Sequence, residues 1–129
     1  MSVENPFDDI PGTTLFDAEK SREGYHLNMF CMSMGDAANR EEFKKDERAY
    51  LDRYPMTAEQ RDCVLKRDAL RLIEIGGNIY FLAKLFYVDG RSVRSVCAAM
   101  SGMTEPEYEQ MLLDGGRSPE GNRSKSEWV

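Results

Sequence analysis

The chain has 129 residues, of which 41% are hydrophobic and 31% charged, with a formal net charge of -6 and a pI near 4.9. This length suits one domain, and the apolar content is too high for a disordered chain. The negative charge would repel phosphate backbones and anionic membrane surfaces, which argues against nucleic acid and membranes as partners.

The apolar stretches and the cysteines predict a soluble, cytoplasmic protein. The longest apolar stretch, residues 79–88, is interrupted by Lys84 and is far shorter than the run of about 18 residues that a bilayer requires. The N-terminus has acidic residues where a secretory signal peptide would have a basic segment. Cys31, Cys63 and Cys97 are odd in number and form no CxxC pair, which favours reduced thiols over disulfides or a structural zinc.

Composition divides the chain into three parts. Residues 1–13 contain two prolines and a glycine and predict an extended N-terminal arm. Residues 14–116 carry helical patterns almost throughout and predict one helical domain. Residues 117–129 are polar, have no period and contain Trp128 as their one large apolar group, so we expect a polar C-terminal tail.

The first predicted helix lies in the stretch GYHLNMFCMSM, residues 24–34, and ends at Gly35. Apolar residues spaced i, i+4, i+7 form two neighbouring strips that give it a wide apolar face. These strips are Tyr25, Met29 and Met32, and Leu27, Cys31 and Met34. Asp36 can cap a second helix, which Pro55 stops. Its apolar stripe consists of Phe43, Tyr50 and Tyr54.

The second half of the chain carries four more helix patterns. A T-x-x-Q capping box at Thr57 opens a helix that stops at Gly76-Gly77. The next helix, residues 79–88, is apolar on all sides. A short helix over residues 93–100 and a last one with a second capping box at Thr104 complete the domain. Since no stretch has the two-residue period of a strand, we predict an all-α fold, a compact domain of five or six helices with extended N- and C-terminal arms.

The only histidine of the chain, His26, limits its metal and catalytic chemistry. A facial-triad iron site needs two histidines, catalytic zinc usually needs three nitrogen or oxygen ligands, and a serine or cysteine triad needs an imidazole beside a nucleophile. Helical spacing gives His26 the polar neighbours Arg22 and Glu23 and no nucleophile. We interpret it as a half-buried or surface residue, and we predict no catalytic residue, metal or cofactor in this chain.

Residues 79–87 carry more aromatic surface than one small helical core needs. A helix that is apolar on every side lies either at the centre of a fold or against another polypeptide, and the sequence leaves both readings open. The polar tail is commonly disordered in such a chain, yet its arginines and tryptophan are residue types favoured as interface anchors. The residues predicted at a partner interface are Tyr80, Phe81, Phe86, Tyr87, Arg117 and Trp128.

Four strings follow one another between Phe7 and Ser124. They are FDDIPGTTLFDAEKSREGYHLNMF, REEFKKDERAYLD, GGNIYFLAKLFYVDGRS and SGMTEPEYEQMLLDGGRSPEGNRS. In this order, and over nearly the whole chain, the sequence resembles the small (α) subunits of protocatechuate 4,5-dioxygenases, extradiol ring-cleaving enzymes of lignin-derived aromatic breakdown.

The resemblance implies a division of labour between two subunits. A large β subunit is expected to hold Fe(II) through two histidines and a glutamate, while this chain covers the active site in an α2β2 assembly. The implied reaction opens the ring of protocatechuate beside its diol and gives 4-carboxy-2-hydroxymuconate semialdehyde. A chain with one histidine fits this division, and the surplus aromatic surface gains a partner to bury it.

The resemblance also implies a lid over the substrate at Gly90, Arg91, Ser92 and Val93. The position of Val93 can hold a phenylalanine beside the substrate in this family, so valine leaves more room. Arg91 and Ser92 are close enough in sequence to meet a substrate carboxylate, although the turn could equally contact only the β subunit.

Two other functions stay open at this point. The chain could be the small subunit of a related gallate or methylated-catechol dioxygenase, because pocket volume near Val93 changes substrate preference only modestly per added group. It could also be a non-enzymatic helical adaptor that serves another complex. A DNA-binding helical domain is disfavoured, since no helix gathers Lys and Arg on one face.

Overall fold

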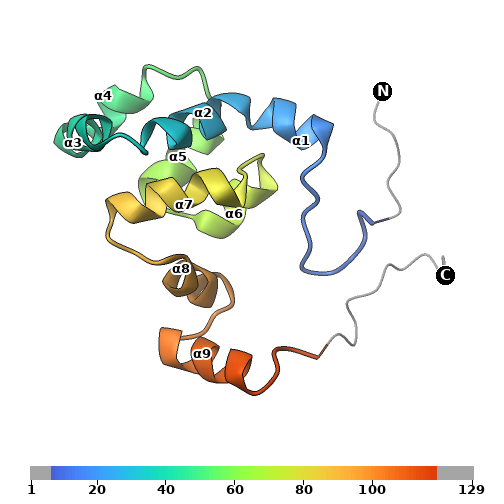
Figure 1. Ribbon diagram of the computed structural model, residues 1–129. Helices are drawn as coiled ribbons and strands as arrows, with labels where there is room; N and C mark the ends of the chain where they lie inside the picture. Colours follow the sequence, from blue (N-terminus) through green and yellow to red (C-terminus); the bar gives the residue numbers. More distant parts are fainter. Residues whose placement is uncertain (1–6, 119–129) are drawn as a thin grey trace.

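The computed structural model describes residues 7–118, and every regular element within them is a helix (Figure 1). This confirms the predicted all-α class. The remaining residues of the predicted arm and tail, 1–6 and 119–129, lie outside this range. The helices of the described residues are α1 (Ala18–Glu23), α2 (Tyr25–Ser33), α3 (Ala37–Lys45), α4 (Glu47–Leu51), α5 (Ala58–Lys66), α6 (Ala69–Glu74), α7 (Ile79–Val88), α8 (Val93–Met100) and α9 (Glu105–Leu113).

Residues 7–118 contain nine helices rather than five or six, because three capped starts add to or divide the predicted elements. Asp17 caps α1, which was not predicted, and its carboxylate accepts a hydrogen bond from the backbone N–H of Lys20 at 2.9 Å. Asp46 has an extended backbone and caps α4, so the predicted second helix is split into α3 and α4. The predicted third helix is split into α5 and α6 at Arg67 and Asp68.

The predicted capping box at the start of α5 is confirmed. The hydroxyl of Thr57 accepts from the backbone N–H of Gln60 at 3.1 Å, and the side-chain oxygen of Gln60 accepts from the N–H of Thr57 at 3.0 Å. The Gln60 amide nitrogen also donates to the carbonyls of Glu23 and Ile75, both at 3.0 Å. One buried side chain therefore ties α5 to the ends of α1 and α6.

The core forms where α2 packs against α7, with α3 to α6 around them (Figure 1). An aromatic cluster fills one end of it: the Phe30 ring lies 5.2 Å from the Phe43 ring and 5.9 Å from the rings of Tyr50 and Tyr54. Tilted and edge-to-face contacts of this kind stabilise a core beyond the area they bury. The largest fully buried apolar side chains are Phe30, Phe43, Leu27, Met34, Leu51, Leu72, Leu82 and Leu85.

Two chain junctions cross at Gly24 and Gly76. Gly24 separates α1 from α2, Gly76 lies between α6 and α7, and a Cβ atom added to Gly24 would lie 1.9 Å from the carbonyl oxygen of Gly76. The buried Asn28 fixes this crossing, because its amide nitrogen donates to the Gly76 carbonyl and its oxygen accepts from the N–H of Asn78, both at 2.9 Å. The glycine pair therefore joins the first two helices to α7.

The last two helices lie on one side of this bundle (Figure 1). Helix α8 contacts α6 and α7, while α9 contacts α8 and contains no buried residue. Leu112 and Leu113 of α9 are 49% and 74% exposed, so this helix carries apolar surface that the described residues do not cover. Within residues 7–118, no helix combines the length and apolar character needed to span a membrane.

Candidate functional site

The predicted lid forms a turn that closes the C-terminal end of α7. The backbone N–H of Gly90 donates to the carbonyl of Tyr87 at 3.0 Å, and the N–H of Arg91 donates to that of Phe86 at 3.1 Å. Gly90 has φ +70°, a left-handed conformation that glycine adopts without strain. The turn thus ends α7 and reverses the chain into α8.

The residues after this turn start α8. The Ser92 hydroxyl accepts from the backbone N–H of Ser95 at 3.0 Å and so acts as the N-cap. Arg91 is half-buried, and Val93 is 45% exposed. The structure brings the four predicted lid residues together in one surface segment, and their contact with substrate stays a prediction.

A single arginine, Arg67, binds Asp89, the residue that precedes this segment. The Arg67 guanidinium donates from Nε to Asp89 Oδ2 at 2.7 Å, and from Nη1 and Nη2 to the two Glu47 carboxylate oxygens at 3.0 and 2.9 Å. Its side chain is 18% exposed and lies over the Phe43 ring, 5.3 Å from the centroid. Burial alone would lower the pKa of Arg67, but the hydrogen bonds to Glu47 and Asp89 outweigh it and raise that pKa. Arg67 is therefore a permanently charged link between α4, the α5–α6 junction and the turn after α7.

A cleft of about 280 Å³ lies beside this link. It runs from the α5–α6 junction to α8, so Arg91 of the predicted lid and Arg67 border the same hollow. Apolar side chains form much of the wall, with two arginines and one aspartate at its polar side. The lining residues are Arg67, Asp68, Ala69, Leu70, Arg91, Val96, Ala99 and Met100.

The predicted partner interface on α7 divides into exposed and buried rings. Tyr80 and Tyr87 are 78% and 66% exposed and stay available to a partner. Phe81 is half-buried against the core. The prediction is wrong for Phe86, which is 3% exposed and packs in the core of this chain, so its ring offers no surface to another subunit.

The other predicted interface residues lie near the C-terminus. Arg117 is exposed and donates to the carbonyl of Ser101 at 3.3 Å, which fastens the chain after α9 back to the end of α8. Trp128 lies outside the described residues. Contact of Arg117 and Trp128 with a partner stays a prediction.

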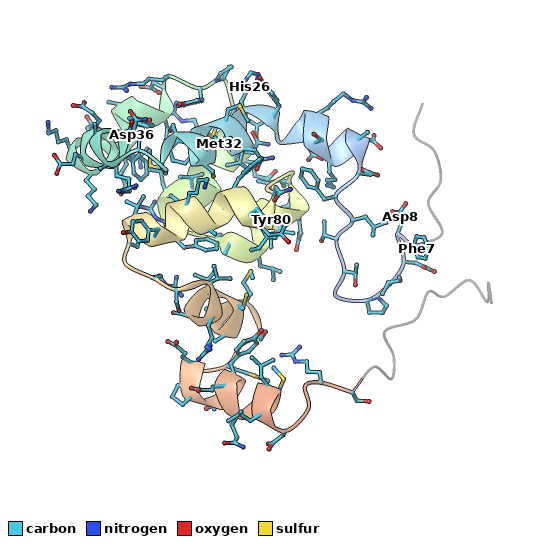
Figure 2. The ribbon with its side chains drawn as sticks, in the orientation of Figure 1. Phe7, Asp8, His26, Met32, Asp36 and Tyr80 are labelled. Carbon is cyan, nitrogen blue, oxygen red and sulfur yellow. The ribbon has the colours of Figure 1, made fainter. Side chains whose placement is uncertain are left out.

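A second, apolar hollow of about 300 Å³ adjoins Tyr80. The segment before α1 passes the start of α7 on the side of the molecule where Tyr80 lies (Figure 2). Leu15 and Phe16 from that segment and Ile73 and Ile79 from the bundle line the hollow. Tyr80 is therefore part of a larger apolar surface than α7 alone provides.

His26 and Cys31 both lie on α2, and neither belongs to a metal or thiol site within the part of the chain that the structure describes. His26 is exposed on α2, with its ring 5.1 Å from that of Tyr25 (Figure 2). Burial raises the pKa of the Cys31 thiol to about 12, so this thiol stays protonated and is a poor nucleophile at neutral pH. Among residues 7–118, no three His, Cys, Asp or Glu side chains gather in a way that could hold a metal ion.

Sequence reasoning missed Arg67. The helical pattern of the sequence continues through Arg67 without a break, so no helix end is indicated there. Its ion-pair partners Glu47 and Asp89 are 20 and 22 residues away, so no local spacing indicates the ion pairs. The one available signal was Asp68, because aspartate is a favoured N-cap residue and Asp68 caps α6.

Two comparisons with known proteins bear on this site. Residues 27–113, which include the lid segment and all of α7, match the model of a family described as the LigA subunit of the aromatic-ring-opening dioxygenase LigAB. The chain is also 30% identical over 99 residues to a gallate dioxygenase of Pseudomonas putida. That match covers 77% of this chain and 29% of the enzyme, so the chain spans less than a third of the length of this relative.

Proposed function

The chain belongs to the LigA-subunit family of aromatic-ring-opening dioxygenases, and from this membership we propose that it is the small subunit of an Fe(II)-dependent extradiol dioxygenase. In this proposal it covers the active site of a catalytic β subunit and assembles with it as α2β2. The single observation that carries the proposal is the family match over residues 27–113.

The iron is proposed to belong to the β subunit. The described residues of this chain do not fit an iron site, because His26 is exposed and no three potential ligands gather around it. A facial-triad site requires two histidines and a carboxylate in one place. We therefore propose that this chain contributes by binding and orienting the substrate and by excluding water from the active site.

Protocatechuate is the substrate we propose, with cleavage at the 4,5 bond to 4-carboxy-2-hydroxymuconate semialdehyde. The collinear resemblance between Phe7 and Ser124 supports this choice. Gallate is a second candidate, because the Pseudomonas putida relative is a gallate dioxygenase. Both are small phenolic carboxylates that differ by one hydroxyl group, and a pocket discriminates such a difference modestly unless it hydrogen-bonds the group.

The lid segment has the chemistry to cover such a substrate. Val93 presents apolar surface, which would exclude water and strengthen polar contacts beneath it. The Ser92 hydroxyl already accepts the cap hydrogen bond, so its proton is free to donate to a carboxylate oxygen. The Arg91 guanidinium can only donate and suits the same carboxylate.

The experiment is to coexpress this chain with a LigAB-type large subunit and to measure oxygen uptake on protocatechuate and on gallate. We expect the two chains to co-purify and to consume oxygen with at least one of these substrates. Co-purification without ring opening on either substrate would favour one of the other two readings, the small subunit of a methylated-catechol dioxygenase or a non-enzymatic helical adaptor. Failure to co-purify with the large subunit would contradict the proposed assembly.

A further inference from the structure

Arg67 occupies a backbone conformation that suits glycine better. With φ 56° and ψ 39° it is left-handed, and among the described residues no other non-glycine residue has a positive φ. An L residue is disfavoured there because its Cβ crowds the backbone, and such outliers persist where the surroundings hold them. A glycine would end α5 with less strain, so the arginine side chain is the part of this residue that needs an explanation.

The side chain is engaged from two directions. One edge of the guanidinium meets Asp89 through Nε and Nη2 at 2.7 and 3.3 Å, and another meets both oxygens of Glu47 at 3.0 and 2.9 Å. Paired hydrogen bonds of this kind fix orientation as well as distance. Asp89 immediately precedes Gly90, so the guanidinium holds the residue that leads into the lid segment.

The two carboxylates have different places in the fold. Glu47 lies in the first turn of α4, which is far from the lid in sequence, whereas Asp89 is the C-cap of α7 and immediately precedes the lid. Their side chains are similarly exposed, at 34% and 30%. Matched substitutions of the two carboxylates can therefore separate an effect on the stability of the fold from an effect on the position of the lid.

We propose that Arg67 is a positioning residue that sets the lid segment, residues 90–93, against the substrate through its ion pair with the preceding residue, Asp89. This inference rests on the proposed function and extends it to a residue outside the lid. It requires that loss of the Asp89 contact disturbs turnover more than loss of the Glu47 contact does.

Three variants of the full chain test it, each in complex with the large subunit. Asp89→Asn and Glu47→Gln each remove one charge at nearly constant size. Arg67→Gly removes the guanidinium from a backbone that accepts glycine without strain. We expect Asp89→Asn and Arg67→Gly to lower kcat/KM for oxygen uptake by about tenfold, with kcat and KM both changed as for a displaced lid, and Glu47→Gln to stay within about twofold. Equal losses from Asp89→Asn and Glu47→Gln would overturn the proposal, because they would mean that the ion pairs only brace the fold.

Hydrogen exchange of the isolated chain gives a readout that does not depend on the reaction. The N–H groups of Gly90 and Arg91 close the turn, so local opening there appears directly in their exchange rates. Asp89→Asn should raise these exchange rates by about tenfold and Glu47→Gln by less than about threefold. The difference is expected because Asp89→Asn removes the carboxylate beside the turn, whereas Glu47→Gln leaves the Arg67–Asp89 ion pair in place. Unchanged rates in Asp89→Asn and Arg67→Gly would refute the positioning role. If the wild-type complex consumes no oxygen while the exchange rates respond as expected, the proposed function fails and the hold of Arg67 on the turn stands.

Discussion

Replacing Gly24 with alanine is expected to prevent the chain from folding. The new Cβ would lie 1.9 Å from the carbonyl oxygen and 2.4 Å from the carbonyl carbon of Gly76, and backbone atoms cannot yield there without separating α2 from α7. Gly24 has φ -96°, which alanine adopts freely, so the whole effect is steric. We expect a loss of more than about 4 kcal/mol, much of the stability of a domain this size.

The matched control is Gly35→Ala. The nearest atom to its added Cβ is the Met32 carbonyl oxygen at 3.4 Å, an ordinary contact, so the expected change is below about 1 kcal/mol. Urea unfolding followed by circular dichroism measures both variants. A Gly24→Ala chain that unfolds cooperatively within about 1 kcal/mol of the wild type would show that the two junctions do not pack as described.

Introducing aspartate at both Tyr80 and Tyr87 is expected to remove most of the affinity for the large subunit. These rings are 78% and 66% exposed, so the isolated chain should keep its fold, whereas burying two carboxylates in an apolar interface is strongly unfavourable. We expect the dissociation constant of the complex to rise by at least about 30-fold, the effect of losing about 2 kcal/mol at an interface hot spot.

Tyr25→Asp serves as the control for this double variant. Tyr25 is also an exposed tyrosine, at 55%, but it lies on α2 outside the predicted interface, so its replacement should leave the affinity within about threefold. Sedimentation velocity over a concentration series measures the binding of each variant. Equal affinity for the wild type and the Tyr80/Tyr87 variant would remove these rings from the interface. Phe86→Asp is not a test of the interface, because Phe86 is a core residue and its replacement would unfold the chain.

The helical class and most helix starts could be predicted because they depend on local chemistry. The capping box at Thr57 forms both of its hydrogen bonds, and Thr104 caps α9 as its sequence indicates. Single aspartates within charged runs were less informative. Asp46 stands in the run KKDER, where nothing in the pattern distinguishes a cap from a solvated side chain, and so one predicted helix became two.

Long-range features could not be predicted from one sequence. Gly76 was expected only to stop a helix, yet it makes the closest backbone crossing to Gly24, 52 residues away by their numbers in the sequence. The stretch 79–88 is apolar all round, so its period could not separate the buried Phe86 from the exposed Tyr87. The contacts of Arg67 with Glu47 and Asp89 likewise arise only after α4, α5 and α7 have packed.

Iron analysis of the separated subunits, with oxygen uptake measured on the same samples, tests whether the large subunit alone holds the iron. We expect this chain to bind no stoichiometric iron and to consume no oxygen with protocatechuate or gallate. We also expect that adding the chain to an iron-loaded large subunit restores ring opening and saturates at one chain per large subunit. Iron-dependent oxygen uptake by this chain alone would contradict this expectation.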